Sequence, residues 1–206
     1  MVLQKPFAAA ILAGGRARRM HGADKSGLEV GGRPILARQL AVLLPLATEV
    51  FIVGRPPADL PPGIRVVPDR IRASGALGGI YTAILESPCE RTLVVACDMP
   101  FLDAPLIRRL AAEDGDLVIP RTARGYEPLC AIYGRACAEP IRQRIEHGDL
   151  QASVPPAGVH LVELGPDALA VLDPGGQMFT NLNTPDDHER ARNTADRISR
   201  DRKGKE

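Results

Sequence analysis

Residues 7–25 read FAAAILAGGRARRMHGADK, and this stretch decides the fold class of the chain. Its first seven residues are apolar without interruption, which is typical of a buried strand in a parallel β-sheet. The strand runs directly into two adjacent glycines, Gly14 and Gly15, and then into a basic loop. Ligands of open α/β sheets bind beyond the carboxyl ends of the strands, so the stretch predicts an α/β domain whose first loop holds a ligand.

The next hundred residues repeat the alternation of strands and helices. Apolar clusters predict further strands, and apolar residues three or four positions apart predict helices between them. The expected strands are 49–53, 64–67, 91–97 and 116–119, and the expected helices are 36–43, 77–86 and 103–113. Because strands that alternate with helices form βαβ units, we expect a mostly parallel sheet covered by helices on both faces.

After residue 120 the pattern is less regular, but it contains no linker long enough to separate a second domain. A loop with Arg121, Arg124 and Gly125 is followed by an expected strand 129–133, helix 136–147, strand 159–164 and a final helix from Pro185. We therefore expect one domain over residues 1–198 and a charged, disordered tail over residues 199–206.

The composition excludes several classes of protein. The chain has 206 residues, of which 45% are apolar and 25% charged, and its net charge of +1 gives no reason to expect a polyanionic partner. Only 3% of the residues are aromatic and none is tryptophan, so the stacking platforms of single-strand nucleic-acid binders are missing. No apolar run approaches the ~18 residues of a membrane helix. Four cysteines without a C-x-x-C pair favour free thiols in a reducing cytoplasm over a zinc site.

The loop after the first expected strand has the composition of a polyphosphate cradle. Gly14 and Gly15 let the backbone approach an anion with its N–H groups, while Arg18, Arg19 and Lys25 neutralise its charge. The loop is not a Walker A motif, because Asp rather than Gly precedes the lysine. The chain has 22 arginines and only 4 lysines, so its basic residues are strongly biased toward arginine. A lysine at position 25 is an exception to this bias. The alternative is an ordinary solvated basic loop.

A single acid follows the strand expected at residues 91–97, which is apolar from Leu93 on. Burying the carboxylate of Asp98 there requires a cation, a helix N-terminus or several donors. Mg²⁺ takes one or two carboxylates together with phosphate oxygens and waters, so Asp98 opposite a phosphate cradle predicts a magnesium site. The alternative is that Asp98 only caps the following turn.

A third candidate segment follows the strand expected at 64–67. Asp69 could accept both the N1–H and the exocyclic amine of guanine, and Gly75, Gly78 and Gly79 at a helix start suit a nucleoside lying against backbone. The alternative for Asp69 is an ordinary surface turn.

Taken together, these motifs resemble those of the molybdenum cofactor guanylyltransferases. The matching patterns are L-A-G-G-x-x-x-R-M-x-x-x-D-K at 12–25, G-x-L-G-G-I at 75–80, C-D-M-P at 97–100, E-P-L at 127–129 and F-x-N-x-N-T-P at 179–185. The resemblance covers residues 7–190. It implies a three-layer, Rossmann-like nucleotidyltransferase fold and transfer of GMP from GTP to the terminal phosphate of molybdenum-molybdopterin, with release of pyrophosphate and Mg²⁺ as the metal.

The resemblance also implies roles for individual residues. Leu12, Ala13 and Gly14 contact the nucleotide, Lys25 binds its phosphates, Asp69 lies by the base, and Asp98 holds GTP and magnesium. We expect Lys25, Asp98 and Arg19 to act on the reacting phosphates. Asn181 and Asn183 match the C-terminal motif and are expected near the pterin or the metal, although two turn-forming amides are the alternative.

Two departures from the family pattern lie on the nucleoside side. The chain has Gly54-Arg55 where the family has an asparagine near the base, and Ala76 where the family has proline. A cytidylyltransferase acting on the same or another phosphorylated acceptor is therefore an alternative, and so is a nucleotide- or cofactor-binding chaperone without activity. Molybdenum-insertion proteins and recipient molybdoenzymes are the protein partners that the resemblance implies.

Overall fold

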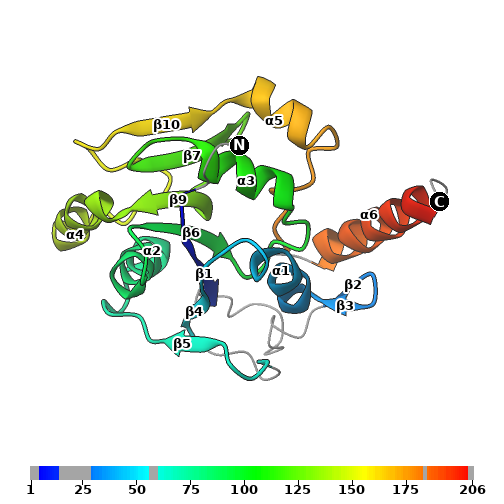
Figure 1. Cartoon of the computed structure of the whole chain (residues 1–206), viewed down its shortest axis with the longest axis horizontal. Helices are drawn as coiled ribbons and strands as arrows, with labels where there is room; N and C mark the ends of the chain where they lie inside the picture. The colour runs from blue at the N-terminus through cyan, green and yellow to red at the C-terminus, as the bar shows by residue number, and fades with distance from the viewer. Residues whose placement is uncertain (1–4, 14–28, 56–59, 183–184, 204–206) are drawn as a thin grey trace.

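The computed structural model of the chain describes residues 5–13, 29–55, 60–182 and 185–203, the last of these ranges with its side chains at 186–195 only. Its centre is an eight-stranded sheet in the order β10-β7-β9-β6-β1-β4-β5, with β8 paired to β7 (Figure 1). The strands of this sheet are β1 (Ala8–Ala13), β4 (Val50–Gly54), β5 (Arg65–Val67), β6 (Arg91–Ala96), β7 (Leu117–Thr122), β8 (Gly125–Tyr126), β9 (Cys130–Gly134) and β10 (Leu161–Leu164).

The predicted first strand lies at the centre of a parallel block. β1 pairs in parallel with β4 on one side and β6 on the other, and β4 continues to β5 in the same direction. Residues 8–12 of β1 are all buried, which explains why this strand is apolar at every position rather than at alternate ones.

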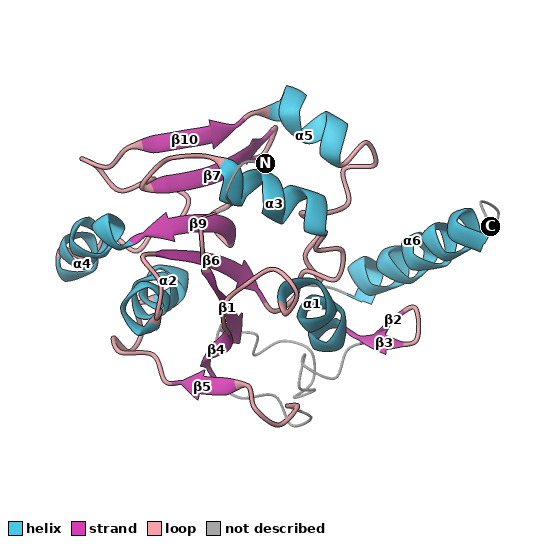
Figure 2. Cartoon of the chain, in the orientation of Figure 1, coloured by secondary structure: helices cyan, strands magenta, loops and turns pink. Residues whose placement is uncertain are grey.

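Helices cover both faces of the sheet and create two separate cores, so three layers are present (Figure 2). α1 (Ile35–Leu43), α3 (Ala104–Ala112) and α5 (Pro166–Leu172) pack against one face, where Ile11 of β1 is buried. α2 (Gly75–Glu86) and α4 (Ala138–Glu146) pack against the other face, where Ala10 and Leu12 are buried. The predicted α/β class, with a mostly parallel sheet between two helical layers, is confirmed.

The irregular part of the sheet comes from the segment after residue 120. β9 runs antiparallel to both β6 and β7, and the loop expected around Arg124 is a tight hairpin of β7 and β8. Gly125 has φ +117°, which explains a glycine at this turn. Three elements have no clear pattern in the sequence and were not expected: β8, the seven-residue helix α5, and the small hairpin of β2 (Glu29–Val30) and β3 (Arg33–Pro34).

The last helix, α6 (Pro185–Lys203), extends away from the body of the molecule (Figure 1). Its Ala191 and Ala195 are buried in a small cluster with Val30, Ile35 and Leu182. The backbone of the helix continues past residue 198, and the domain boundary expected there stays a prediction. In the part of the chain that the structure describes, no helix is both long enough and apolar enough to cross a membrane.

Candidate active site

The parallel strands bring three of the predicted segments to one edge of the sheet. β6, β1, β4 and β5 all end at this edge, and they are followed respectively by Asp98, the first loop, Arg55 and Asp69. Neighbouring strands lie about 4.8 Å apart, so the ends of β6 and β5 at Ala96 and Val67, three strands apart, are separated by about 14 Å. Leu12 and Ala13, at the end of β1, lie between them.

The turn that carries Asp98 is in contact with two other predicted segments. The Cys97 N–H donates to the Leu12 carbonyl at 3.3 Å, and the Leu182 N–H donates to the Asp98 carbonyl at 3.2 Å. Asp98 itself is half-buried. The end of the first strand, the strand-end acid and the C-terminal motif, which are far apart in the sequence, are therefore neighbours.

Asp98 provides a carboxylate at this point of the edge. Within the described ranges no group of three or more His, Cys, Asp or Glu residues could hold a metal ion. The described residues therefore do not form a complete set of protein ligands for a metal ion. A single half-buried carboxylate does fit Mg²⁺, because this ion keeps waters and shares its remaining positions with substrate phosphates.

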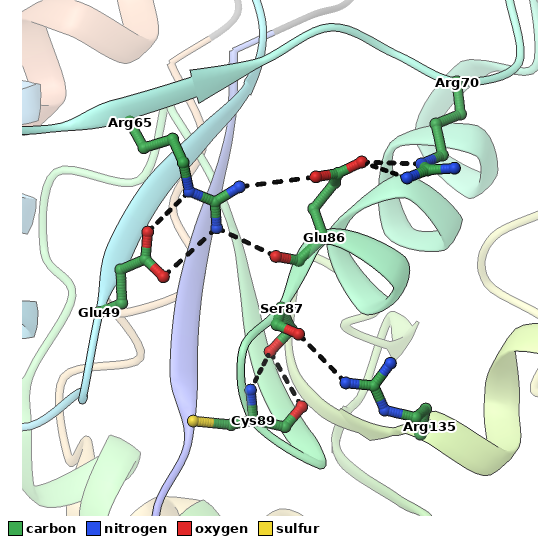
Figure 3. Close-up of polar contacts among 7 residues, drawn as sticks. All are labelled: Glu49, Arg65, Arg70, Glu86, Ser87, Cys89 and Arg135. Atoms are coloured by element: carbon green, nitrogen blue, oxygen red, sulfur yellow. Dashed lines mark hydrogen bonds and ion pairs between the residues drawn. The ribbon is translucent and has the colours of Figure 1, made fainter.

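Asp69 stands on a loop that is anchored to helix α2. The backbone N–H of the next residue, Arg70, donates to Thr82 Oγ1 at 3.0 Å, and the Arg70 Nε donates to Glu86 Oε1 at 2.8 Å. Glu86 in turn contacts Arg65 of β5, which makes two hydrogen bonds to Glu49 at 2.8 and 3.3 Å (Figure 3). The loop therefore has a fixed attachment immediately after Asp69.

The carboxyl group of Asp69 remains available to a ligand. Asp69 is exposed and makes no hydrogen bond or ion pair to any other residue that the structure describes, and desolvation by the surrounding protein raises the pKa of its carboxyl group. A carboxylate that has lost part of its hydration without gaining a partner is suited to accept hydrogen bonds from a bound molecule.

The three glycines at the start of α2 have different surroundings. Gly75 is exposed, has φ +60° and leaves open space where a side chain would be. Gly78 and Gly79 are buried: a Cβ on Gly78 would lie 1.7 Å from Ser74 Oγ, and one on Gly79 would lie 3.0 Å from Leu12 Cδ1. Gly75 can therefore face a ligand. At Gly78 and Gly79 the absence of a side chain is explained by packing inside the protein, because Ser74 and Leu12 lie where a Cβ would be.

The C-terminal motif is held against the β7–β8 hairpin. Arg124 Nη2 donates to the Phe179 carbonyl at 2.9 Å and to Glu127 Oε1 at 3.1 Å, and the Thr122 hydroxyl donates to the same Glu127 oxygen at 2.9 Å. Asn181 is exposed between this contact and the buried Leu182. No role was expected for Arg124 or Glu127, although the E-P-L motif, which begins at Glu127, is a sequence signal that could have indicated one.

The remaining predicted residues, Gly14, Gly15, Arg18, Arg19, Lys25 and Asn183, lie outside the described residues. The structure places the two ends of the first loop, since Ala13 ends β1 and Glu29 begins β2. The Arg55 N–H donates to the Ala13 carbonyl at 3.0 Å, so the loop starts beside the end of β4.

Comparison with known proteins agrees with this arrangement. Residues 9–156 match the family model described as "MobA-like NTP transferase domain". The chain is 36% identical over 188 residues to the probable molybdenum cofactor guanylyltransferase of Chloroflexus aggregans, covering 86% of this chain and 89% of that protein. It is also 36% identical over 185 residues to the protein of the same name from Pelotomaculum thermopropionicum, covering 88% and 90%. Among solved structures, molybdopterin-guanine dinucleotide biosynthesis protein A from Archaeoglobus fulgidus superposes with a TM-score of 0.78 at 25% identity, over 92% of this chain and 99% of that one.

Proposed function

Because the chain belongs to the MobA-like NTP transferase family, and within it to the molybdenum cofactor guanylyltransferases, we propose that it transfers GMP from GTP to the terminal phosphate of molybdenum-molybdopterin and releases pyrophosphate. Membership of this family, which the motifs predicted, is confirmed. The observation that carries the proposed reaction is the 36% identity to proteins of that name over 86% of the chain. The edge of the sheet, with Asp98 at one end and Asp69 at the other, supports it.

The two ends of the site suit the two ends of GTP. The carboxylate of Asp69 accepts hydrogen bonds from the N1–H and the exocyclic amine of guanine, and the open backbone at Gly75 lies against the nucleoside. The phosphates extend across the ends of β4 and β1 toward Asp98, over a span of about 14 Å between the ends of β5 and β6. Leu12 and Ala13 lie under the middle of the nucleotide.

Charge neutralisation dominates the chemistry at the phosphate end. Asp98 is the residue that would hold Mg²⁺, which when bound neutralises the α- and β-phosphates and the departing pyrophosphate. Lys25 and one of Arg18 or Arg19 bind the same oxygens, and the Gly14 and Gly15 N–H groups complete the cradle.

The acceptor needs orientation more than activation. A phosphate monoester is already ionised near neutral pH, so no general base is required for its attack on the α-phosphorus. Asn181, next to the Asp98 turn through Leu182, and Asn183 hold the pterin or its phosphate in line. The hairpin with Arg124 and Glu127 keeps this segment in place.

The reaction is tested by supplying molybdenum-molybdopterin and Mg²⁺ with each of the four nucleoside triphosphates separately. Mass spectrometry is expected to find the guanine dinucleotide with GTP alone, with one pyrophosphate released per product. A cytosine dinucleotide would instead indicate a cytidylyltransferase, and binding of nucleotide without pyrophosphate would indicate a chaperone. Asp98→Ala is expected to abolish turnover while metal-free GTP binding persists, and a normal Mg²⁺-dependent rate in this variant would refute the metal assignment.

The proposed reaction also implies a cellular compartment and protein partners. None of the four cysteines, Cys89, Cys97, Cys130 and Cys137, is in a disulfide, which suits a reducing cytoplasm. Proteins that insert molybdenum would supply the acceptor, and molybdoenzymes would receive the product.

A further inference from the structure

Helix α1 contains one side chain that does not fit its apolar face. Gln39 has no exposed surface, and it lies on the same buried face as Ile35, Leu36, Leu40 and Leu43. An amide in such surroundings is unfavourable unless it finds hydrogen-bond partners. Its partners therefore indicate why a polar residue stands there.

Both hydrogen bonds of Gln39 go to the turn that carries Asp98. Its Nε2 donates to the carbonyl of Ala96 at 2.7 Å and to the carbonyl of Met99 at 3.1 Å. Ala96 is the last residue of β6, and Met99 follows Asp98. One nitrogen thus holds the backbone on both sides of Asp98, although helix α1 is 57 to 60 residues away in the sequence.

A glutamine meets these requirements better than its alternatives. It offers two N–H donors on one nitrogen without bringing a charge into the core, whereas lysine and arginine are charged and an ionised glutamate only accepts. The same amide has a cost, because its Oε1 is buried without a donor among the residues described. Stability alone would favour an apolar residue, so the two contacts to the turn are the feature that explains Gln39.

We propose that Gln39 is a positioning residue for the phosphate end of the active site. By fixing the carbonyls of Ala96 and Met99 from inside the core, it sets the direction in which the Asp98 carboxylate leaves the turn. The Leu182 N–H holds the Asp98 carbonyl as well, so the turn is attached to two separate segments. The inference rests on the proposed function, since it gives Asp98 its role toward the metal.

The test measures metal binding rather than turnover. Mn²⁺ is titrated, with electron paramagnetic resonance as the readout, into the enzyme saturated with the α,β-methylene analogue of GTP, which cannot react. Gln39→Met keeps the length and apolar packing of the side chain but removes both donors. It is expected to weaken Mn²⁺ binding by about 10–100-fold, the usual effect of losing a residue that orients a metal ligand, with metal-free binding of the analogue unchanged.

Arg91→Met is the matched control for a lost set of buried hydrogen bonds. Arg91 is also buried and donates to main-chain carbonyls, but these are Ala111 O and Glu113 O at the end of α3, and Arg91 stands at the opposite end of β6 from Asp98. This variant is expected to lose stability and to keep its Mn²⁺ affinity once the folded fraction is taken into account.

Gln39→Glu adds a pH signature that a simple packing role would not give. A buried carboxyl group has a raised pKa, and only its protonated form can donate to one of the two carbonyls. Mn²⁺ affinity in this variant is therefore expected to recover in part as the pH is lowered from 8 to 6, relative to wild type measured at the same pH.

The outcomes separate this inference from the proposed function. If Asp98→Ala abolishes Mn²⁺ binding but Gln39→Met leaves it within about twofold of wild type, the positioning role is wrong and the metal site stands. If Asp98→Ala leaves Mn²⁺ binding intact, the metal assignment itself fails, and the role of Gln39 fails with it. A Gln39→Glu affinity that follows the wild-type pH profile also counts against the positioning role.

Discussion

Replacing Gly78 with alanine tests how the start of α2 is packed beneath the loop that carries Asp69. A Cβ at this position would lie 1.7 Å from Ser74 Oγ and 2.7 Å from Ser74 Cβ, far below the ~3.5 Å at which such atoms attract. Ser74 has little freedom to move away, because it is buried and its hydroxyl donates to the Ile71 carbonyl at 2.5 Å. The new methyl group therefore has to displace the Ser74 side chain and break this hydrogen bond.

The size of the effect follows from three contributions. Forcing one extra carbon into a packed site costs about 1–3 kcal/mol, and losing the Ser74 hydrogen bond costs about 1 kcal/mol more. Alanine gains about 0.5–1 kcal/mol over glycine inside a helix. The net loss in the free energy of unfolding is about 1–3 kcal/mol, and a loss of about 2 kcal/mol lowers the melting temperature of a chain of this size by about 4–8 °C.

Urea unfolding, followed by circular dichroism, measures this loss. Gly79→Ala is the matched control, because it makes the same change at the next residue of the helix and meets only the flexible end of Leu12, at 3.0 Å. It should cost clearly less than Gly78→Ala. Adding Ser74→Gly to Gly78→Ala removes the clashing atoms and should recover part of the lost stability. If Gly78→Ala is as stable as wild type, or if Ser74→Gly brings no recovery, the packing argument is refuted.

Three further predictions concern single side chains. Desolvation by the surrounding protein raises the pKa of Asp69, so GTP affinity should begin to fall, as the pH is lowered, at a higher pH than an ordinary aspartate would give. Asp69→Asn should remove this dependence and the preference for GTP over ITP, which lacks the exocyclic amine; an unchanged preference in fluorescence titrations would contradict the base contact. Lys25→Arg keeps the charge of the first loop but replaces a compact ammonium with a broad guanidinium, so steady-state kinetics should show a large loss of turnover, and wild-type turnover would make Lys25 an ordinary loop cation. Burial raises the pKa of Cys130 to about 12, so iodoacetamide at pH 8 should label the partly exposed Cys89 and Cys97 in the folded protein and leave Cys130 unlabelled, as peptide mapping would show. GTP should slow the labelling of Cys97, next to Asp98, and not that of Cys89.

The elements predicted correctly are those whose pattern is set by burial alone. β1 and β6 lie in the middle of the sheet with helices on both faces. β1 is therefore apolar at every position and β6 is apolar from Leu93 on, so both can be recognised without knowing their neighbours. The direction of β9 could not be read in this way, because an apolar strand looks the same whether its partners are parallel or antiparallel. Helix α5 has seven residues, too few to show a helical repeat.

The positions of the candidate residues could be predicted to the extent that these residues follow strands of the parallel sheet. Asp98 and Asp69 could be assigned to one edge because parallel strands in βαβ units all end there. Arg70, Thr82 and Glu86, which fix the position of Asp69, gave no signal, because their contacts join a loop to the middle and end of a helix. Such contacts depend on how the helix rests on the sheet, which a single sequence does not specify.

Gly78 and Gln39 show that residue type alone does not reveal every group that a residue contacts. Gly78, one of three glycines at a helix start, is predicted to contact the nucleotide, and the structure adds a contact inside the protein, because Ser74 occupies the space that a side chain at position 78 would fill. A glutamine in an amphipathic helix is normally assigned to the solvent face, yet Gln39 lies on the buried face with its donors on the Asp98 turn. In both cases the physical requirement is simple: position 78 must leave space for Ser74, and position 39 must supply two uncharged donors. The group that imposes the requirement is hard to identify from the sequence, because Ser74 lies in a loop and Ala96 and Met99 are distant from Gln39 along the chain. The parts of an active site that orient the reacting groups are for this reason harder to predict than the groups themselves.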